Sequence, residues 1–176
     1  GVDLVVHSAS KYLSGHSDVV AGVVAGTAEH LEGMRRYERM LIGGSLAPQQ
    51  AWLLIRGLRT LPIRMQRHHL AGLQVARAVA QHRSVQKVLH PGLPDNQYHD
   101  RARRQLAGYA SLFSIVVNAD NAAIIKALDR MKVFQYGPSW GGFESLIVAP
   151  SLETDENVRK RVQAPPGLVR LYVGLE

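Results

Sequence analysis

The feature that most constrains this chain is a lysine placed at the end of an apolar strand pattern. Lys11 follows the run VDLVV at residues 2–6 and stands in a short segment of small, hydroxylated residues. Lysine is almost never buried without a partner, so an amine at the end of a β-branched run is in an unusual position. Such a lysine can simply reach solvent, because its stem is flexible. It can also present its amine to a carbonyl group, as enzymes with a nucleophilic lysine require.

The residues around Lys11 extend this pattern into a longer motif. Residues 7–18 read HSASKYLSGHSD, and further blocks follow in order at 56–61 (RGLRTL), 139–146 (SWGGFESL) and 169–176 (VRLYVGLE). The first motif resembles the lysine segment of the Cys/Met-metabolism family of pyridoxal-phosphate-dependent enzymes, with only Ser14 outside the pattern. The three later blocks are similar to family segments in family order, so the resemblance covers essentially the whole chain.

The resemblance implies an α/β fold, namely the C-terminal part of a fold-type I pyridoxal-phosphate-dependent transferase. Residues 1–59 would be the end of the large cofactor-binding domain with its Schiff-base lysine, and residues 60–176 the small C-terminal α/β domain. A family subunit has a long stretch before the lysine segment and a closing helix after the last block. We therefore expect roughly the second half of a subunit, inactive by itself, from a homo-oligomer that is a dimer of dimers in the family, a homotetramer.

The apolar periodicity agrees with an α/β arrangement. Residues 2–7 and 22–26 read as buried strands of a larger sheet. Thr27 is a candidate N-cap for a helix that ends at Gly43-Gly44, and Ser45 is a candidate cap for the next, which runs to about Leu58. Thr60 with Pro62 predicts a fresh helix start and a domain boundary. Beyond it we expect helices at 63–82, 98–107 and 120–130, a turn at 90–92, strands at 85–89, 111–117, 145–149 and 168–173, and a loop at 164–167.

An enzyme that uses pyridoxal phosphate on an amino acid needs a Schiff-base lysine, hydroxyls for the phosphate, a cation for the substrate carboxylate and a base for the α-proton. The resemblance assigns Lys11 both the Schiff base and the proton transfer, and assigns Ser8 and Ser10 to the phosphate. Arg170 is the carboxylate candidate, because a planar guanidinium matches a carboxylate with two parallel hydrogen bonds. Strand alternation alone would favour an arginine on the surface, and the family block reverses that preference.

The block at 139–142 is by itself only a tight turn with a tryptophan. In the family, the serine of this block lies near the lysine and the substrate carboxylate, which assigns Ser139 to substrate binding. The aromatic residue after it resembles the cystathionine β-lyase branch, whereas the γ-enzymes tend to have leucine there. Trp140 and Tyr136 would then line the substrate pocket, and residues 145–149 are similar to the same branch.

Composition narrows the alternatives. Of 176 residues 46% are hydrophobic and 20% charged, which is typical of a globular protein, and the absence of cysteine excludes disulfides and thiolate nucleophiles. No apolar run approaches the ~20 residues of a membrane helix, and we expect a cytoplasmic protein. Scattered histidines, at positions 68, 69, 82, 90 and 99, lack the spacing of a metal site, so no metal is expected.

The net charge of +7 raises the possibility of nucleic-acid binding. Three groups of arginines, at positions 35, 36 and 39, at 56, 59, 64 and 67, and at 101, 103 and 104, indicate instead polar helix faces without interleaved aromatic residues. We therefore expect neither a nucleic-acid nor a membrane partner. A positive field would still attract a cofactor phosphate or an amino-acid carboxylate.

These observations favour a pyridoxal-phosphate-dependent carbon–sulfur lyase of transsulfuration and methionine biosynthesis. The expected reaction is β-elimination of cystathionine, or a related thioether amino acid, to a thiol, pyruvate and ammonia. The alternative within the chemistry is γ-elimination or γ-replacement, of the cystathionine γ-lyase, γ-synthase or methionine γ-lyase type. A catalytically silent interaction or oligomerisation domain is an alternative of another class, and a basic nucleic-acid binder a third.

Overall fold

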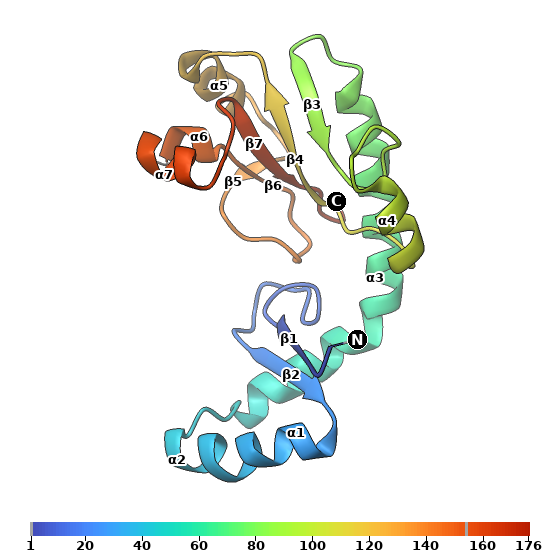
Figure 1. Ribbon diagram of the computed structural model, residues 1–176, viewed down its shortest axis with the longest axis vertical. Helices are drawn as coiled ribbons and strands as arrows, with labels where there is room; N and C mark the ends of the chain where they lie inside the picture. Colours follow the sequence, from blue (N-terminus) through green and yellow to red (C-terminus); the bar gives the residue numbers. More distant parts are fainter. Residues whose placement is uncertain (1, 154) are drawn as a thin grey trace. The chain divides into compact units, whose positions relative to one another are not determined.

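The computed structural model describes residues 2–153 and 155–176, apart from the side chains of Ser151 and Glu153 (Figure 1). It divides into two compact units, Gly1–Leu61 and Pro62–Glu176. Helix α3 (Pro48–Ala80) contributes to both units. Each unit is described by itself.

The first unit contains a two-stranded sheet and a helical segment. Strand β1 (Leu4–Ser8) pairs antiparallel with β2 (Gly22–Gly26). A helical segment then runs through α1 (Ala28–Gly33), the π-helical turn η1 (Met34–Glu38) and α2 (Arg39–Ile42). Thr27 caps α1 by accepting from the His30 amide, and Gly43 ends α2 with φ of 72°. The sequence predicted both strands. It also predicted that the helical segment begins after Thr27 and ends at Gly43.

The prediction that β1 and β2 are buried is wrong for the described chain. Val6 is 72% exposed, and Leu41 and Ile42 of α2, which share the apolar spacing of the helical segment, are 80% and 78% exposed. The physical reason is that the described residues add no further strand to this sheet, so its faces and the apolar side of the helices are not enclosed by a second layer.

Helix α3 is a single element of 33 residues, which corrects two predictions. Ser45 does not cap it, because the helix begins at Pro48, where the missing N–H costs nothing, and the Ser45 hydroxyl accepts from Arg39 Nε at 3.4 Å. Pro62 lies inside the helix and starts no new one. Proline removes one backbone bond there, and packing along the rest of a long helix outweighs that loss.

The second unit is built on a five-stranded sheet of order β3-β4-β7-β6-β5. Its strands are β3 (Val85–Leu89), β4 (Leu112–Val117), β5 (Gln135–Tyr136), β6 (Leu146–Val148) and β7 (Leu168–Tyr172). Only the short β5–β6 pair is parallel, and the other pairs are antiparallel. The helices are α4 (His99–Gln105), α5 (Asn121–Leu128), α6 (Pro150–Glu153) and α7 (Glu156–Arg161).

The core of this unit lies between the sheet and the helices that cover it. It is formed mainly by Ala76 of α3, Ile124 of α5, Phe113 and Ile115 of β4, Ile147 of β6, and Val169 and Leu171 of β7. The sequence predicted β3, β4, β6, β7, α4 and α5 to within a few residues. It missed β5, α6 and α7, because elements of two to six residues are too short to show a periodicity.

Two histidines of the second unit are buried, His68 on α3 and His90 after β3. Burial lowers the pKa of His68 below its usual value of 6.5, and the nearby positive Arg64 and Arg67 lower it further against the effect of the Val173 carbonyl. Burial likewise lowers the pKa of His90. Both rings are therefore neutral in the folded protein at neutral pH.

We expect acid to destabilise the second unit below about pH 6.5. Both histidines bind protons more readily in the unfolded chain, so the free energy of unfolding falls with pH from the unfolded pKa down to the lower folded pKa, by at most about 1.4 kcal/mol per pH unit for each ring. Urea denaturation at pH 7.5 and 5.5 measures this loss, which His68→Gln and His90→Gln should each reduce. His82→Gln, at an exposed position, is the control. An equal loss in the unmutated protein and all three variants would show that the two buried histidines do not cause the loss of stability in acid.

Candidate active site

Lys11 stands on a compact turn that follows β1. Its own amide donates to the Ser8 carbonyl at 3.2 Å, and its carbonyl accepts from the Gly15 amide at 2.8 Å. The Ser14 amide donates to the carbonyl of Ala9, which is fully buried, at 3.0 Å. The Lys11 side chain is half-buried. These backbone bonds fix the point from which the amine extends.

The two serines before Lys11 differ in their surroundings. The Ser10 hydroxyl donates to the Ala21 carbonyl at 3.3 Å and accepts from the Ala21 amide at 2.9 Å, so it ties the turn to the residue before β2. Ser8 ends β1 and is exposed. The exposed Ser8 hydroxyl and the Lys11 amine fit a phosphorylated carbonyl cofactor as they stand. Ser10 fits as a phosphate donor only if its proton turns away from the Ala21 carbonyl.

Glycine at position 57 explains how this turn packs on helix α3. A Cβ atom at Gly57 would collide with the carbonyl oxygens of Leu13 and Ser14. The backbone of the turn therefore lies directly against the helix, at a distance that no side chain permits. The RGLRTL block thus supports the lysine turn from behind.

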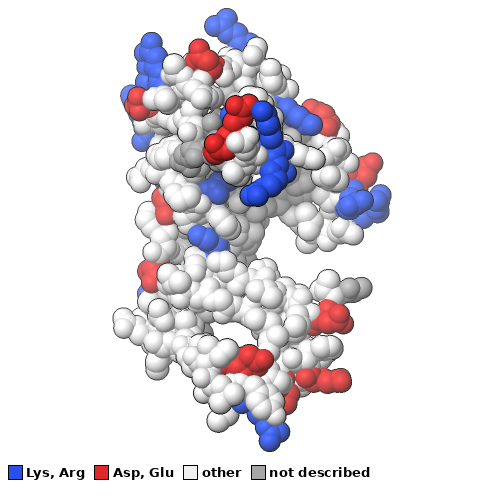
Figure 2. All heavy atoms as spheres, turned by 60° about the vertical axis from the view of Figure 1, so that its left-hand side comes forward, with Lys and Arg blue, Asp and Glu red and all other residues white. Residues whose placement is uncertain are grey.

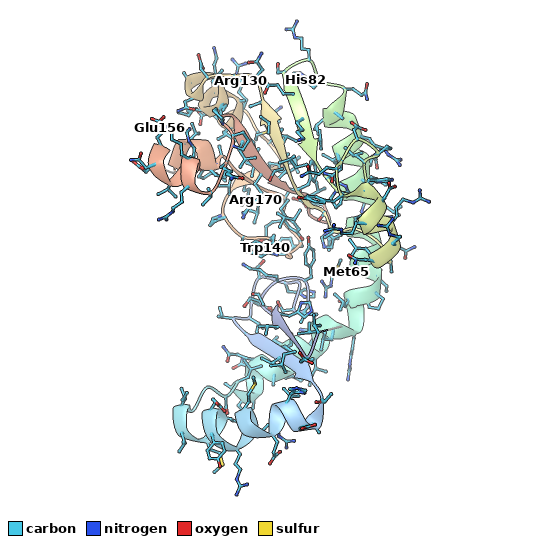
Figure 3. All side chains as sticks on the ribbon, in the orientation of Figure 1. Met65, His82, Arg130, Trp140, Glu156 and Arg170 are labelled. Atoms are coloured by element: carbon cyan, nitrogen blue, oxygen red, sulfur yellow. The ribbon has the colours of Figure 1, made fainter. Side chains whose placement is uncertain are left out.

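Arg170 lies in the middle of β7, between two residues of the core. Val169 and Leu171 are 5% exposed each, so Arg170 points to the opposite face of the sheet, where it is half-buried. Its Nη2 donates to the Ser139 carbonyl at 3.2 Å, and its guanidinium carbon lies 5.6 Å from the centre of the Trp140 ring. Figure 3 shows Arg170 and Trp140 on the strand and the loop that carry this contact.

The structure thus brings together three of the predicted substrate-binding residues, Ser139, Trp140 and Arg170. Tyr136 lies on β5 and is 55% exposed, and it lines a hollow with Ile125, Leu128 and Leu152. Its part in substrate binding stays a prediction. Lys11 belongs to the first unit and the Arg170 group to the second.

Sequence reasoning missed a set of buried polar residues beside the Arg170 group. Tyr172, His68 and Ser111 are each at most 1% exposed, and Arg64 is 7% exposed. Arg64 was predicted to lie on a polar helix face, which is wrong, because α3 presents that position to the second unit. The two-residue spacing of Arg170 and Tyr172 on one strand was a signal that both share a face.

The structure also shows how charged side chains, possible metal ligands and apolar helices are distributed in the described residues. On the face drawn in Figure 2, Lys and Arg side chains lie interspersed with Asp and Glu rather than in one basic patch. Among residues 2–153 and 155–176, no three side chains of His, Asp or Glu gather as a metal site would require. In that part of the chain no helix is both long enough and apolar enough to cross a membrane.

Comparison with known proteins agrees with this geometry. Residues 1–176 match the family described as Cys/Met metabolism PLP-dependent enzyme. The cystathionine beta-lyase of Coxiella burnetii is 37% identical over 181 residues, covering all of this chain and 47% of the relative. The cystathionine gamma-synthase of Mycobacterium leprae is 41% identical over 177 residues, covering all of this chain and 46% of the relative.

A solved structure shows the same fold. The cystathionine gamma synthase from Xanthomonas oryzae pv. oryzae, in complex with aminoacrylate and cysteine, superimposes with a TM-score of 0.92 at 34% identity, over all of this chain and 46% of that one. The chain thus spans about half the length of the relatives that it matches. From the lysine turn, the arginine strand and these matches together, the chain belongs to the Cys/Met-metabolism family of pyridoxal-phosphate-dependent enzymes.

Proposed function

We propose that this chain supplies the cofactor lysine and the substrate-carboxylate arginine of a carbon–sulfur lyase that cleaves cystathionine, or a related thioether amino acid, by β-elimination. The observation that carries the proposal is the Lys11 turn, in which a half-buried lysine is bonded through its backbone amide to the exposed Ser8 inside the family's lysine motif. A protein of the relatives' length that contains these residues would carry the activity.

In this proposal Lys11, Ser8 and Ser10 hold the cofactor, with the amine at its carbonyl and the hydroxyls at its phosphate. Bound pyridoxal phosphate supplies an electron-accepting ring that stabilises the negative charge left when a proton leaves the substrate Cα. Lys11 Nζ takes that proton, because an amine displaced by the substrate amine stays next to Cα. The backbone bonds of the turn fix the point from which the Lys11 side chain extends.

Arg170 would bind the substrate carboxylate through its two terminal nitrogens. The Ser139 carbonyl already orients Nη2, and the indole face of Trp140 lies against the guanidinium. These two contacts orient the guanidinium. A carboxylate that docks here would also be shielded from water by the indole.

The choice between β- and γ-chemistry depends on the substrate side chain. In β-elimination the thiolate leaves as soon as the Cα proton is gone, and Trp140 supports this choice because it would restrict the chain beyond Cβ. γ-Replacement needs a second proton transfer from Cβ. It is the second candidate, because the gamma-synthase of M. leprae is 41% identical to this chain. The homo-oligomeric state and the cytoplasmic location stay predictions.

Replacing Lys11 by alanine in a family-length protein should abolish turnover. The change removes the amine that holds the cofactor and moves the Cα proton. Thiol release from L-cystathionine and the absorbance of protein-bound cofactor measure both losses. Lys126→Ala, at an exposed position on α5, is the matched control and should leave both unchanged. Cystathionine cleavage retained by Lys11→Ala would refute the assignment of the lysine.

Replacing Arg170 by alanine should weaken substrate binding far more than cofactor binding. Loss of a partly desolvated charge pair costs about 2 to 5 kcal/mol in kcat/KM. Steady-state kinetics with L-cystathionine and titration with pyridoxal phosphate separate the two effects. Arg130→Ala, an exposed arginine of the same unit, is the control. A kcat/KM equal to that of the unmutated protein would show that Arg170 is only structural.

Product analysis decides between the two reactions. A family-length protein given L-cystathionine should release homocysteine and pyruvate, and Trp140→Leu should lower this β-elimination because the smaller side chain no longer confines the substrate. Mass spectrometry of both reactions identifies the products. Cysteine and 2-oxobutanoate as the main products of the unmutated protein would replace the β-lyase proposal by γ-elimination.

A further inference from the structure

Alternate residues of β7 and its extension bind successive positions of the loop that carries Ser139 and Trp140. Arg170 donates from Nη2 to the Ser139 carbonyl, and the Tyr172 hydroxyl donates to the Gly142 carbonyl at 2.6 Å. Two residues further on, the Gly174 amide donates to the Ser145 hydroxyl at 2.9 Å. Residues two apart on a strand share a face, so the side chains of Arg170 and Tyr172 hold the loop from one side of β7, and the backbone amide of Gly174, beyond the strand, adds a third bond.

Of the Arg170–Ser139 and Tyr172–Gly142 hydrogen bonds, the Tyr172 bond is the buried one. Tyr172 is fully buried, whereas Arg170 is half-buried, and Gly142 is buried as well. A buried carbonyl that loses its hydrogen-bond donor bears the cost of its lost hydration. The bond at 2.6 Å is short, as expected for a hydroxyl donor. Tyr172 is therefore placed to determine where Gly142, and with it Trp140 and Ser139, can lie.

His68 contacts the Tyr172 hydroxyl, and the Tyr172–Gly142 hydrogen bond determines the tautomer of its ring. Its Nε2 lies 3.3 Å from the Tyr172 oxygen, and its Nδ1 lies 3.0 Å from the Ser111 hydroxyl. Because the single Tyr172 proton goes to Gly142, the tyrosine oxygen accepts from Nε2–H, and Nδ1 accepts the Ser111 proton. A neutral ring satisfies this series of hydrogen bonds, which runs from Ser111, just before β4, through α3 and β7 to the loop.

The positively charged side chains near His68 also favour a neutral ring. Buried Arg64 and nearby Arg67 both act against a charged His68 ring, while the Val173 carbonyl, 3.3 Å from Nδ1, acts in its favour. The neutral ring prevails, since burial is the largest influence and has the same sign as that of the arginines. Burial and these charges keep the ring neutral, and the Tyr172–Gly142 hydrogen bond, not the charges, selects the tautomer with the proton on Nε2.

We propose that Tyr172, held by His68, is a positioning residue for the substrate-carboxylate site. Tyr172 touches neither cofactor nor substrate in this proposal. It fixes the loop whose Ser139 carbonyl and Trp140 ring orient Arg170. The kinetic test of this inference rests on the proposed function, because it needs cystathionine cleavage. The ordering of the loop can be measured without any activity.

The test uses Tyr172→Phe in a family-length protein, which removes only the hydroxyl. KM for L-cystathionine should rise about three- to tenfold, as expected for the loss of one buried hydrogen bond, with kcat changed less than about twofold. Hydrogen exchange read by mass spectrometry should become faster in the peptide that covers residues 139–145. Tyr109→Phe is the matched control, since Tyr109 belongs to the same unit and stacks on His69 instead.

A second pair of variants tests the role of His68. His68→Gln keeps an N–H donor near the position of Nε2 and should retain KM, whereas His68→Leu removes the donor and should raise KM as Tyr172→Phe does. These two variants also test the proposal if Tyr172→Phe fails to fold. If His68→Gln and His68→Leu have the same KM as each other and the same hydrogen exchange in the loop, the proposal is overturned.

The remaining outcomes separate this inference from the proposed function. A purely structural role for Tyr172 would reduce the fraction of active protein, which lowers apparent kcat and leaves KM and loop exchange unchanged, and that result overturns the inference. If the unmutated protein does not cleave cystathionine, the proposed function fails. Hydrogen exchange then still decides: faster exchange at 139–145 in Tyr172→Phe supports positioning of the loop, and unchanged exchange refutes it.

Discussion

The second unit depends on strand β7, because one face of this strand packs in the core and the other binds the loop 139–145. Val169 and Leu171 enter the core between sheet and helices, while Arg170 and Tyr172 point to the opposite side and bind the loop 139–145. The strand pairs with β4 on one side and with β6 on the other, so its register is held from both directions. A shift by one residue would exchange core and loop-binding residues, and the core therefore secures the position of the arginine.

The first unit positions its lysine by different means. Backbone hydrogen bonds hold the Lys11 turn together, and the Ser10 hydroxyl binds it to Ala21. The turn also packs directly on Gly57 of α3, while most residues of the adjoining strands are exposed. The exposed valines of β1 and β2 and the exposed apolar residues of α2 show that this unit buries little of its own apolar surface. Local backbone bonding thus holds the turn from which the Lys11 side chain extends.

These two devices correspond to two requirements of the family's chemistry. In the proposed mechanism Lys11 stays near the cofactor and the substrate, and the backbone turn fixes the point from which it extends. In the same mechanism Arg170 meets a planar carboxylate, and the Ser139 carbonyl and the Trp140 indole face orient its guanidinium. The choice of bond broken in the substrate is set by the side chains that surround its Cβ and Cγ, and Trp140 is one of them in the proposed mechanism.

From the sequence alone came the residue types and their local setting: the lysine motif at 7–18, the strand that contains Arg170, the caps at Thr27 and Gly43, and the α/β class of the second unit. These follow from short-range rules of periodicity, capping and turn chemistry, and from motifs that read the same in any context. Tertiary structure decided the rest. Helix α3 continues through Pro62 because packing along its length outweighs one lost backbone bond. Arg64 and His68 are buried because α3 presents them to the sheet, and Ser10 binds Ala21 because β1 and β2 pair. The hydrogen-bonded chain from Ser111 through His68 and Tyr172 to Gly142 joins residues up to 104 positions apart, and no local pattern records such a contact.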